Sequence, residues 1–146
     1  MIYMLYIIVS IHIILTRCSC FIITAVGLYA KDCEKKGVKF RTFETHFEDN
    51  DRSICDGETV GMVRIRVEEK SDKILGATVI GQGAGNMISE ITLAMQSNTG
   101  LGSLAAVIHP YPTTAEAIRQ TGDLYNRTKL TTNVKSILRG LINVQR

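Results

Sequence analysis

Two alternating segments joined by a short charged turn constrain the fold of this chain more than any other feature. In GMVRIRV, the apolar residues Val63, Ile65 and Val67 are separated by two arginines, and KILGATVIG follows after the turn EEKSD. Alternation along a strand places every second side chain on the same face. The two segments therefore predict an antiparallel hairpin with one buried face.

The segments that precede the hairpin predict another strand and short helices. AVGLYAKDCEKKG indicates the end of a strand around Val26 and a polar helix that stops at Gly37, a residue suited to a left-handed C-cap. VKFRTFETHF alternates apolar and polar residues, which predicts a half-buried strand with a slip or bulge near Phe43. EDNDRSICDGE is rich in charged and turn-forming residues, so we expect a loop or a single helical turn there.

The second half of the chain predicts helices. GAGNMISEITLAMQSNTG carries apolar residues at helical intervals from Met87 to Met95, and LGSLAAVI indicates a short helix or turn. We expect a longer helix over residues 114–127 and an amphipathic C-terminal helix over residues 131–146. Strands in one half and helices in the other predict an α+β fold, in which an antiparallel sheet is covered by helices on one side.

The first thirty residues differ in composition from the rest, because Arg17 is their only charged residue. Residues 1–15 form an uncharged, mostly apolar run. This is shorter than the roughly 20 that span a bilayer, although continuing to Ala30 supplies the length. Residues 1–24 are therefore interpreted as an apolar leader with three alternatives: a non-native segment such as a misread exon boundary, a membrane anchor, or a signal peptide. Membrane association would occur through residues 1–30, and cytoplasmic and organellar locations both remain open.

Charge and cysteine content exclude some classes of function. The chain has 17 basic and 14 acidic residues, and the basic ones are scattered rather than gathered in a stripe, so no nucleic-acid partner is expected. Its four cysteines are too few and too irregularly spaced for the disulfide framework of a small secreted domain. They form no cluster with other metal ligands, so we predict no metal site.

The segment IHPYPTTAEAIRQTGDLYNRTKLT carries the strongest candidate site. Pro110 and Pro112 restrict the backbone on either side of Tyr111 and hold it on a stiff loop. Thr113 and Glu116 match the S/T-x-x-E capping box at the start of a helix. Tyr111 and Glu116 have two interpretations: a proton-handling pair, or a surface anchor beside a helix cap.

A glycine-rich segment, residues 81–85, separates the hairpin from the first long helix. Backbone amides at a helix start can bind phosphate, as in dinucleotide-binding folds. Here Asn86 occupies the position of the last glycine of that motif, and the preceding strand belongs to a hairpin. We therefore interpret the segment as a turn that packs a helix against a sheet, and predict no cofactor-binding residue in this chain.

Several of these segments together resemble a known family. AVGLYAKDCEKKGVKF, the hairpin, AGNMISEITLAMQ and IHPYPTTAEAIRQTGDLYNRTKLT are similar to the C-terminal dimerisation domain of FAD-dependent pyridine nucleotide-disulfide oxidoreductases. The resemblance covers about residues 25–130. It implies a domain that dimerises, as a homodimer or with a full-length relative.

The resemblance also implies roles for single residues. In this family a loop of one subunit enters the partner's active site, where a histidine backed by a glutamate five residues later serves as acid-base catalyst. Glu116 matches that glutamate, whereas Tyr111 occupies the histidine position, as in the mercuric reductase-like branch. A phenol is a poor base at neutral pH, which argues against glutathione reductase-type chemistry. Because the loop serves the partner's active site, Tyr111 and Glu116 are expected to act only in a dimer that includes flavin domains.

In intact relatives, FAD and NAD(P)H would supply the electrons. We expect this chain, as a truncated form of such an enzyme, to bind neither cofactor and to be inactive alone. The alternative is a non-catalytic interaction protein, membrane-anchored through its leader, that dimerises with full-length relatives.

Overall fold

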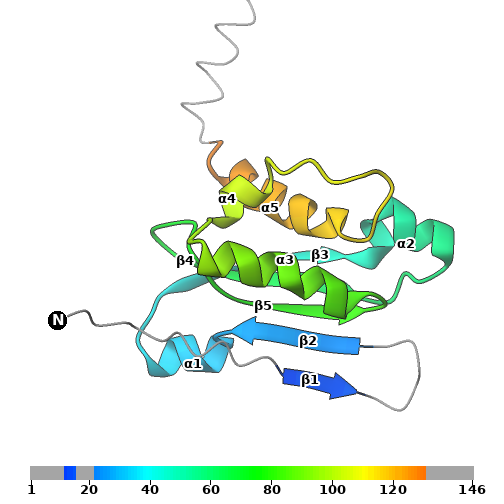
Figure 1. Ribbon diagram of the computed structural model, residues 1–146. Coiled ribbons are helices and arrows are strands. Elements are labelled where there is room, and N and C mark those ends of the chain that lie inside the picture. The colour runs from blue at the N-terminus through cyan, green and yellow to red at the C-terminus, as the bar shows by residue number, and fades with distance from the viewer. Residues whose placement is uncertain (1–11, 16–21, 131–146) are drawn as a thin grey trace, which may run out of the picture.

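The computed structural model describes residues 12–15 and 22–130, which form one antiparallel sheet with helices packed on it (Figure 1). The strands are β1 (His12–Leu15), β2 (Ile22–Gly27), β3 (Phe40–His46), β4 (Met62–Glu68) and β5 (Ile74–Gly81), in the order β1-β2-β5-β4-β3. The helices are α1 (Ala30–Lys35), η1 (Phe47–Asp49), α2 (Asp51–Asp56), α3 (Ala84–Gln96), α4 (Leu101–Leu104) and α5 (Glu116–Thr128). The predicted α+β class is confirmed.

The predicted hairpin forms the centre of the sheet. Strand β4 pairs with β5, with Val63 opposite Val79 and Ile65 opposite Ala77. These four side chains are fully buried on the face that α3 and α5 cover. Alternation in the sequence was therefore sufficient to identify the buried face.

Strand β3 corrects one prediction, because it pairs with β4 without a break from Phe40 to His46. The predicted bulge near Phe43 is wrong, and the register shift lies instead at Arg66 and Val67, where β4 meets β5. The expectation placed Phe40 and Phe43 on one face, which would require an extra residue. In the structure Phe43 is buried with Thr45 beneath α5, whereas Phe40 is half-buried on the other face.

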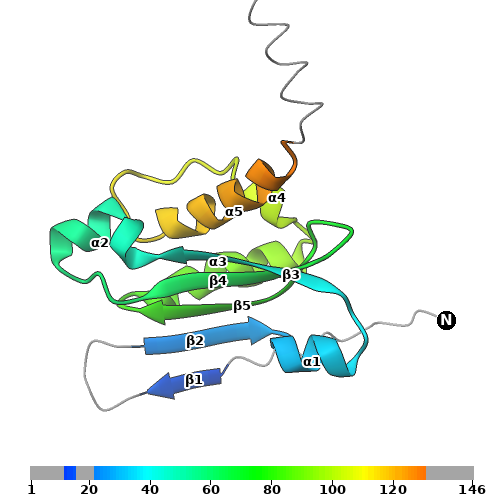
Figure 2. The ribbon, with the colours of Figure 1, turned by 180° about the vertical axis from the view of Figure 1, so that it is seen from behind.

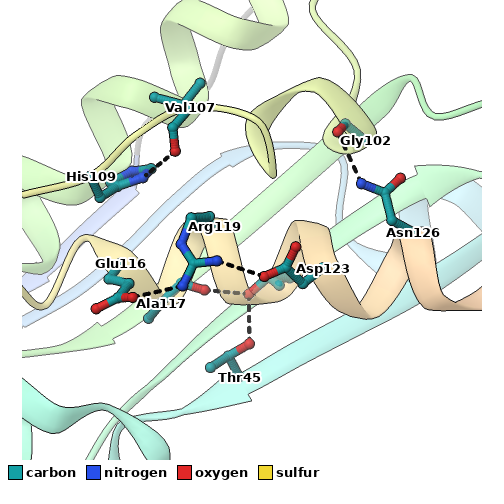
Figure 3. A network of polar contacts seen from close by, with 10 residues as sticks. Thr45, Gly102, Val107, His109, Glu116, Ala117, Arg119, Asp123 and Asn126 are labelled. Carbon is teal, nitrogen blue, oxygen red and sulfur yellow. Dashed lines mark hydrogen bonds and ion pairs between the residues drawn. The ribbon is translucent and has the colours of Figure 1, made fainter. Parts of the chain in front are cut away.

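Helices α3 and α5 lie side by side over the same face of the sheet (Figure 1), and Figure 2 shows β4 and β5 from the opposite side. The two helices and the sheet share one core, whose largest fully buried apolar side chains are Phe47, Ile65, Ile91, Leu101 and Ile118. A buried hydrogen bond of 2.9 Å from the hydroxyl of Thr121 to that of Thr45 also links α5 to β3 (Figure 3).

The face of the sheet opposite α3 and α5 carries the two arginines of the hairpin. Arg66 is 4% exposed, and its Nε donates a hydrogen bond of 2.9 Å to the carbonyl of Leu28, where the chain passes from β2 to α1. Burial lowers the pKa of this guanidinium, since it has left water. Arg64 instead makes a partly exposed ion pair of 2.8 Å with Glu44. Arg66 therefore fixes the chain between β2 and α1.

The short polar helix predicted before Gly37 is confirmed. Helix α1 ends just before Gly37, and α2 occupies the segment where a loop or a single helical turn was expected. Helix α2 is capped by Asn50, whose Oδ1 accepts a hydrogen bond of 3.0 Å from the amide of Ser53. Both residues are fully buried, so this short helix has a fixed position on the domain.

Parts of the sequence-based division into segments fall outside the described residues. The described residues do not include residues 1–11 and 16–21 of the leader, among them Cys18 and Cys20. They also do not include the tail helix expected over residues 131–146. Within the described residues, β1 and the first residues of β2 join the sheet N-terminal to the boundary expected at residue 25. No helix in this part of the chain has the length and apolar composition needed to cross a membrane.

Candidate functional site

The loop of residues 107–115 connects α4 to α5 and passes over the outside of the helical layer (Figure 1). Ile108 is 94% exposed and Tyr111 is 71% exposed, and the peptide bond between Tyr111 and Pro112 is cis. The most exposed large apolar side chains of the loop therefore face solvent in the isolated chain. A loop of this kind is suited to contact another molecule.

His109 anchors the first part of this loop. Its imidazole is only 5% exposed, with Nε2 3.1 Å from a carboxylate oxygen of Glu90 on α3. Nδ1 lies 3.1 Å from the carbonyl of Val107 within the same loop (Figure 3). Because both ring nitrogens are engaged, His109 serves to hold the loop against α3.

Tyr111 is held by a residue from a distant part of the sequence. Its hydroxyl donates a hydrogen bond of 2.8 Å to Oδ2 of Asp51, the first residue of α2. This hydrogen bond, followed by the charge of Asp51, raises the pKa of the phenol above its ordinary value, with a smaller contribution from Glu116. Tyr111 is therefore a protonated phenol at neutral pH with its hydrogen directed at α2.

Glu116 makes a different contact. It begins α5, and its carboxylate forms an ion pair of 2.6 Å with Arg119, which also binds Asp123 (Figure 3). The carboxylate of Glu116 raises the pKa of Arg119, so the guanidinium stays charged. The structure brings Tyr111 and Glu116 to the same end of the domain without a hydrogen bond between them.

The predicted capping box at Thr113 and Glu116 is wrong. The N-cap residue is Ala115, with no side-chain cap, and the hydroxyl of Thr113 is buried with no partner among the described residues. Backbone carbonyls take the place of the cap, since the amides of residues 116, 117 and 118 bond to the carbonyls of residues 113, 114 and 115. The carboxylate of Glu116 binds Arg119 in place of the amide of Thr113 that a capping box would use.

Asn50 supplies a further anchor that the sequence did not reveal as part of the site. Its Nδ2 donates a hydrogen bond of 3.1 Å to the carbonyl of Thr113. Asn50 and Asp51 are adjacent, so one end of α2 binds the loop at two points. Asn at a helix start is a recognised capping signal, but nothing in the local pattern links it to a loop sixty residues later.

A cavity of about 500 Å³ lies beside the loop. Its lining includes Pro112 and Thr113 from the loop, Arg52 and Asp56 from α2, and Gly83 before α3. Arg52 and Asp56 neutralise each other in an ion pair of 2.7 Å. Glu58 also lines the cavity, so the net charge of its lining is negative and does not favour an anion.

The glycine-rich segment forms a turn between β5 and α3, as predicted. Gly83 is the N-cap of α3 with φ of 74°, a left-handed conformation that favours glycine. The carbonyl of Ala84 accepts a hydrogen bond of 3.2 Å from the buried hydroxyl of Thr24 on β2. The segment thus fastens α3 to an antiparallel sheet, unlike the parallel strand and helix of a dinucleotide-binding motif.

The cysteines in the described part of the chain are both free thiols. Cys33 is buried in α1, and burial raises the pKa of its thiol. Cys55 is exposed on α2. No group of three or more His, Cys, Asp and Glu side chains that could hold a metal occurs within residues 12–15 and 22–130.

Comparison with known proteins identifies the fold. LpdA from Mycobacterium tuberculosis superposes with a TM-score of 0.71 over 80% of this chain and 25% of its own, at 22% identity. The HOCl-induced flavoprotein disulfide reductase RclA from Escherichia coli gives 0.67 over 70% of this chain and 23% of its own, at 18% identity. At this level of identity the similarity concerns the fold alone.

Sequence comparison identifies the family. Mitochondrial dihydrolipoyl dehydrogenase from Sus scrofa is 35% identical over 95 residues, which are 65% of this chain and 19% of the relative. The enzyme from Rattus norvegicus is 36% identical over the same length. The chain thus spans about a fifth of the length of these relatives. The family model of the pyridine nucleotide-disulphide oxidoreductase dimerisation domain matches residues 19–121, and the chain therefore belongs to this family.

Proposed function

We propose that this chain is the dimerisation domain of a flavin-dependent NAD(P)H:disulfide-type oxidoreductase and that its loop of residues 107–115 enters the partner subunit's active site. The supporting observation is that this loop is exposed at its tip and fixed at its base. Ile108 and Tyr111 face solvent, while His109 and the carbonyl of Thr113 are bound to the domain. Such a loop can present side chains to a partner with little loss of conformational entropy.

Tyr111 and Glu116 are the residues proposed to act at that shared site. Tyr111 is largely exposed on the loop, whereas Glu116 lies in the first turn of α5. Tyr111 in the position of the family histidine supports the mercuric reductase-like branch. Because the raised pKa keeps the phenol protonated at neutral pH, we propose that Tyr111 orients a reacting thiol by hydrogen bonding and does not remove its proton.

Electron transfer would require FAD and NAD(P)H bound by other domains. We expect the purified 146-residue chain to bind no FAD and to oxidise no NAD(P)H. The measurement is the absorbance spectrum after incubation with FAD and gel filtration, followed by an NAD(P)H oxidation assay. A full-length dihydrolipoyl dehydrogenase treated in parallel is the positive control, and a yellow protein with flavin absorbance would contradict the proposal.

The proposed interface makes a separate prediction. The purified chain should self-associate, and Ile108→Asp should weaken that association at least about tenfold, because a desolvated charge in an interface costs several kcal/mol. Sedimentation analysis over a range of concentrations measures the dissociation constant.

Thr42→Asp is the matched control. Thr42 is exposed on β3 and lies on the face of the sheet away from α3 and α5, so the same added charge should leave association unchanged. Equal effects of the two variants would show that net charge, and not the loop, governs association. A wild-type chain that stays monomeric would argue against dimerisation by this domain alone.

A further inference from the structure

The sequence pattern pairs Tyr111 with Glu116, but the side chains are arranged differently. The hydroxyl of Tyr111 lies 2.8 Å from Oδ2 of Asp51, a residue on α2 that is 60 positions away in the sequence. The carboxylate of Glu116 is bound to Arg119 at 2.6 Å and is 15% exposed. Two carboxylates are thus near the phenol, and one of them accepts its hydrogen.

We propose that Asp51 is the positioning residue of Tyr111, and that the Asn50–Asp51 corner of α2 sets where the phenol points at the shared active site. This inference rests on the proposed function, since it specifies how the loop that enters the partner is oriented. In this inference Asp51, and not Glu116, is the direct hydrogen-bond partner of the phenol.

The rigidity of this corner carries the inference. Asn50 is fully buried, its Oδ1 accepts from the amide and the hydroxyl of Ser53, and its Nδ2 donates to the carbonyl of Thr113. The next residue, Asp51, then reaches Tyr111 two positions before Thr113. Asn50 and Asp51 therefore bind the loop on both sides of Pro112. Together these contacts fix the backbone at Thr113 and the side chain of Tyr111.

The direction of this hydrogen bond has a chemical consequence. A phenol has one hydrogen, and here it is donated to Asp51, so the oxygen lone pairs remain available to accept from another group. Tyr111 would then receive a hydrogen bond from a thiol of the partner subunit. To donate its own hydrogen, it would first have to break the bond to Asp51.

The titration of Tyr111 tests the proposal on the chain itself, without flavin or dimer. The charged or titratable groups that face its hydroxyl are Asp51 and Cys55 from α2 and Glu116 from α5. The pKa is measured by NMR on the chain carrying ¹³C-labelled tyrosine, and Tyr111→Phe assigns the resonance. In Asp51→Asn, we expect the raised pKa of Tyr111 to fall towards the value of free tyrosine, and Asp51→Glu should restore part of the increase.

Two variants serve as controls. Asp56→Asn removes a carboxylate from the same helix that binds Arg52 and not Tyr111, so the titration should not change. Glu116→Gln should lower the pKa of Tyr111 less than Asp51→Asn does. The proposal is overturned if Asp51→Asn leaves the titration unchanged, or if Glu116→Gln lowers it as much.

The reciprocal measurement keeps the test valid if Asp51→Asn fails to fold. In Tyr111→Phe, the side-chain carboxyl resonance of Asp51 should shift and that of Glu116 should not, and the reverse pattern would reject the proposal. These readings are independent of the sedimentation experiment. A monomeric chain with an Asp51-dependent titration would therefore argue against dimerisation by this domain alone and would leave the contact between Tyr111 and Asp51 standing.

Discussion

Replacing Phe47 with alanine is expected to lower the free energy of unfolding by about 3–5 kcal/mol, the usual cost of deleting a buried aromatic ring. Phe47 is 1% exposed and lies between β3 and α2. Its ring packs directly on the backbone at Gly61 and Gly81, where a Cβ would lie 2.7 Å from ring carbons. Because glycine leaves no side chain to move into the space, the cavity cannot collapse and the full cost should appear.

Chemical denaturation followed by far-ultraviolet circular dichroism measures this loss, at a fixed protein concentration because dimerisation would add to stability. Ile54→Ala is the matched control. Ile54 is 53% exposed on α2, so its truncation should change stability by no more than about 0.5 kcal/mol. A loss below about 1 kcal/mol in Phe47→Ala would mean that the ring is not part of the core.

The central strands and the first long helix show where sequence reasoning was adequate. The alternation in β4 and β5 and the helical spacing in α3 each specify a buried face, and the structure confirms both. Such patterns are local, because a strand or helix repeats its geometry every few residues. The choice of an α+β fold with a covered antiparallel sheet followed from those elements alone.

The helix cap and the strand bulge were not predictable in the same way, because each depends on which of several hydrogen-bond or packing partners a residue takes. The capping box at Thr113 was a valid local motif, but backbone carbonyls satisfy the helix amides and Glu116 binds Arg119 instead. The bulge assigned to Phe43 followed from assuming that Phe40 shared its face. In both cases a second arrangement satisfied the same residues, and the sequence pattern did not distinguish between them.

The candidate site illustrates the limit most clearly. The sequence identified the loop and Tyr111, since prolines on both sides of a tyrosine restrict the backbone. It did not identify Asp51, because that contact joins residues 60 positions apart and depends on how α2 packs beside the loop. Contacts between distant segments follow from the assembled fold.

The second large effect is expected at Gly76 in β5, where Gly76→Ala should lower the free energy of unfolding by about 3 kcal/mol. A Cβ built at this position would lie 2.3 Å from the carbonyl oxygen and 2.6 Å from the amide nitrogen of Leu28. Both contacts are with backbone atoms, so no side-chain rotation can relieve them. The chain between β2 and α1 would have to move.

Gly85→Ala provides the matched control for this substitution. Gly85 lies in α3, and a Cβ there would meet no atom within 4 Å. Alanine favours the helix by about 0.5–1 kcal/mol relative to glycine, so this variant should be neutral or slightly more stable. Denaturation of the two variants under identical conditions measures the difference.

The loss of unfolding free energy in Gly76→Ala should exceed the loss from the steric contact alone, because Leu28 is also hydrogen-bonded to Arg66. The carbonyl of Leu28 accepts the hydrogen bond from Nε of Arg66, a guanidinium that is 4% exposed. Displacing Leu28 would leave a buried charged donor without this partner, which is more costly than losing an exposed hydrogen bond. If Leu28 links Gly76 to Arg66, Gly76→Ala should lower the free energy of unfolding less in the Arg66→Met background than in the wild type. Additive effects of the two substitutions would show that the two positions are independent.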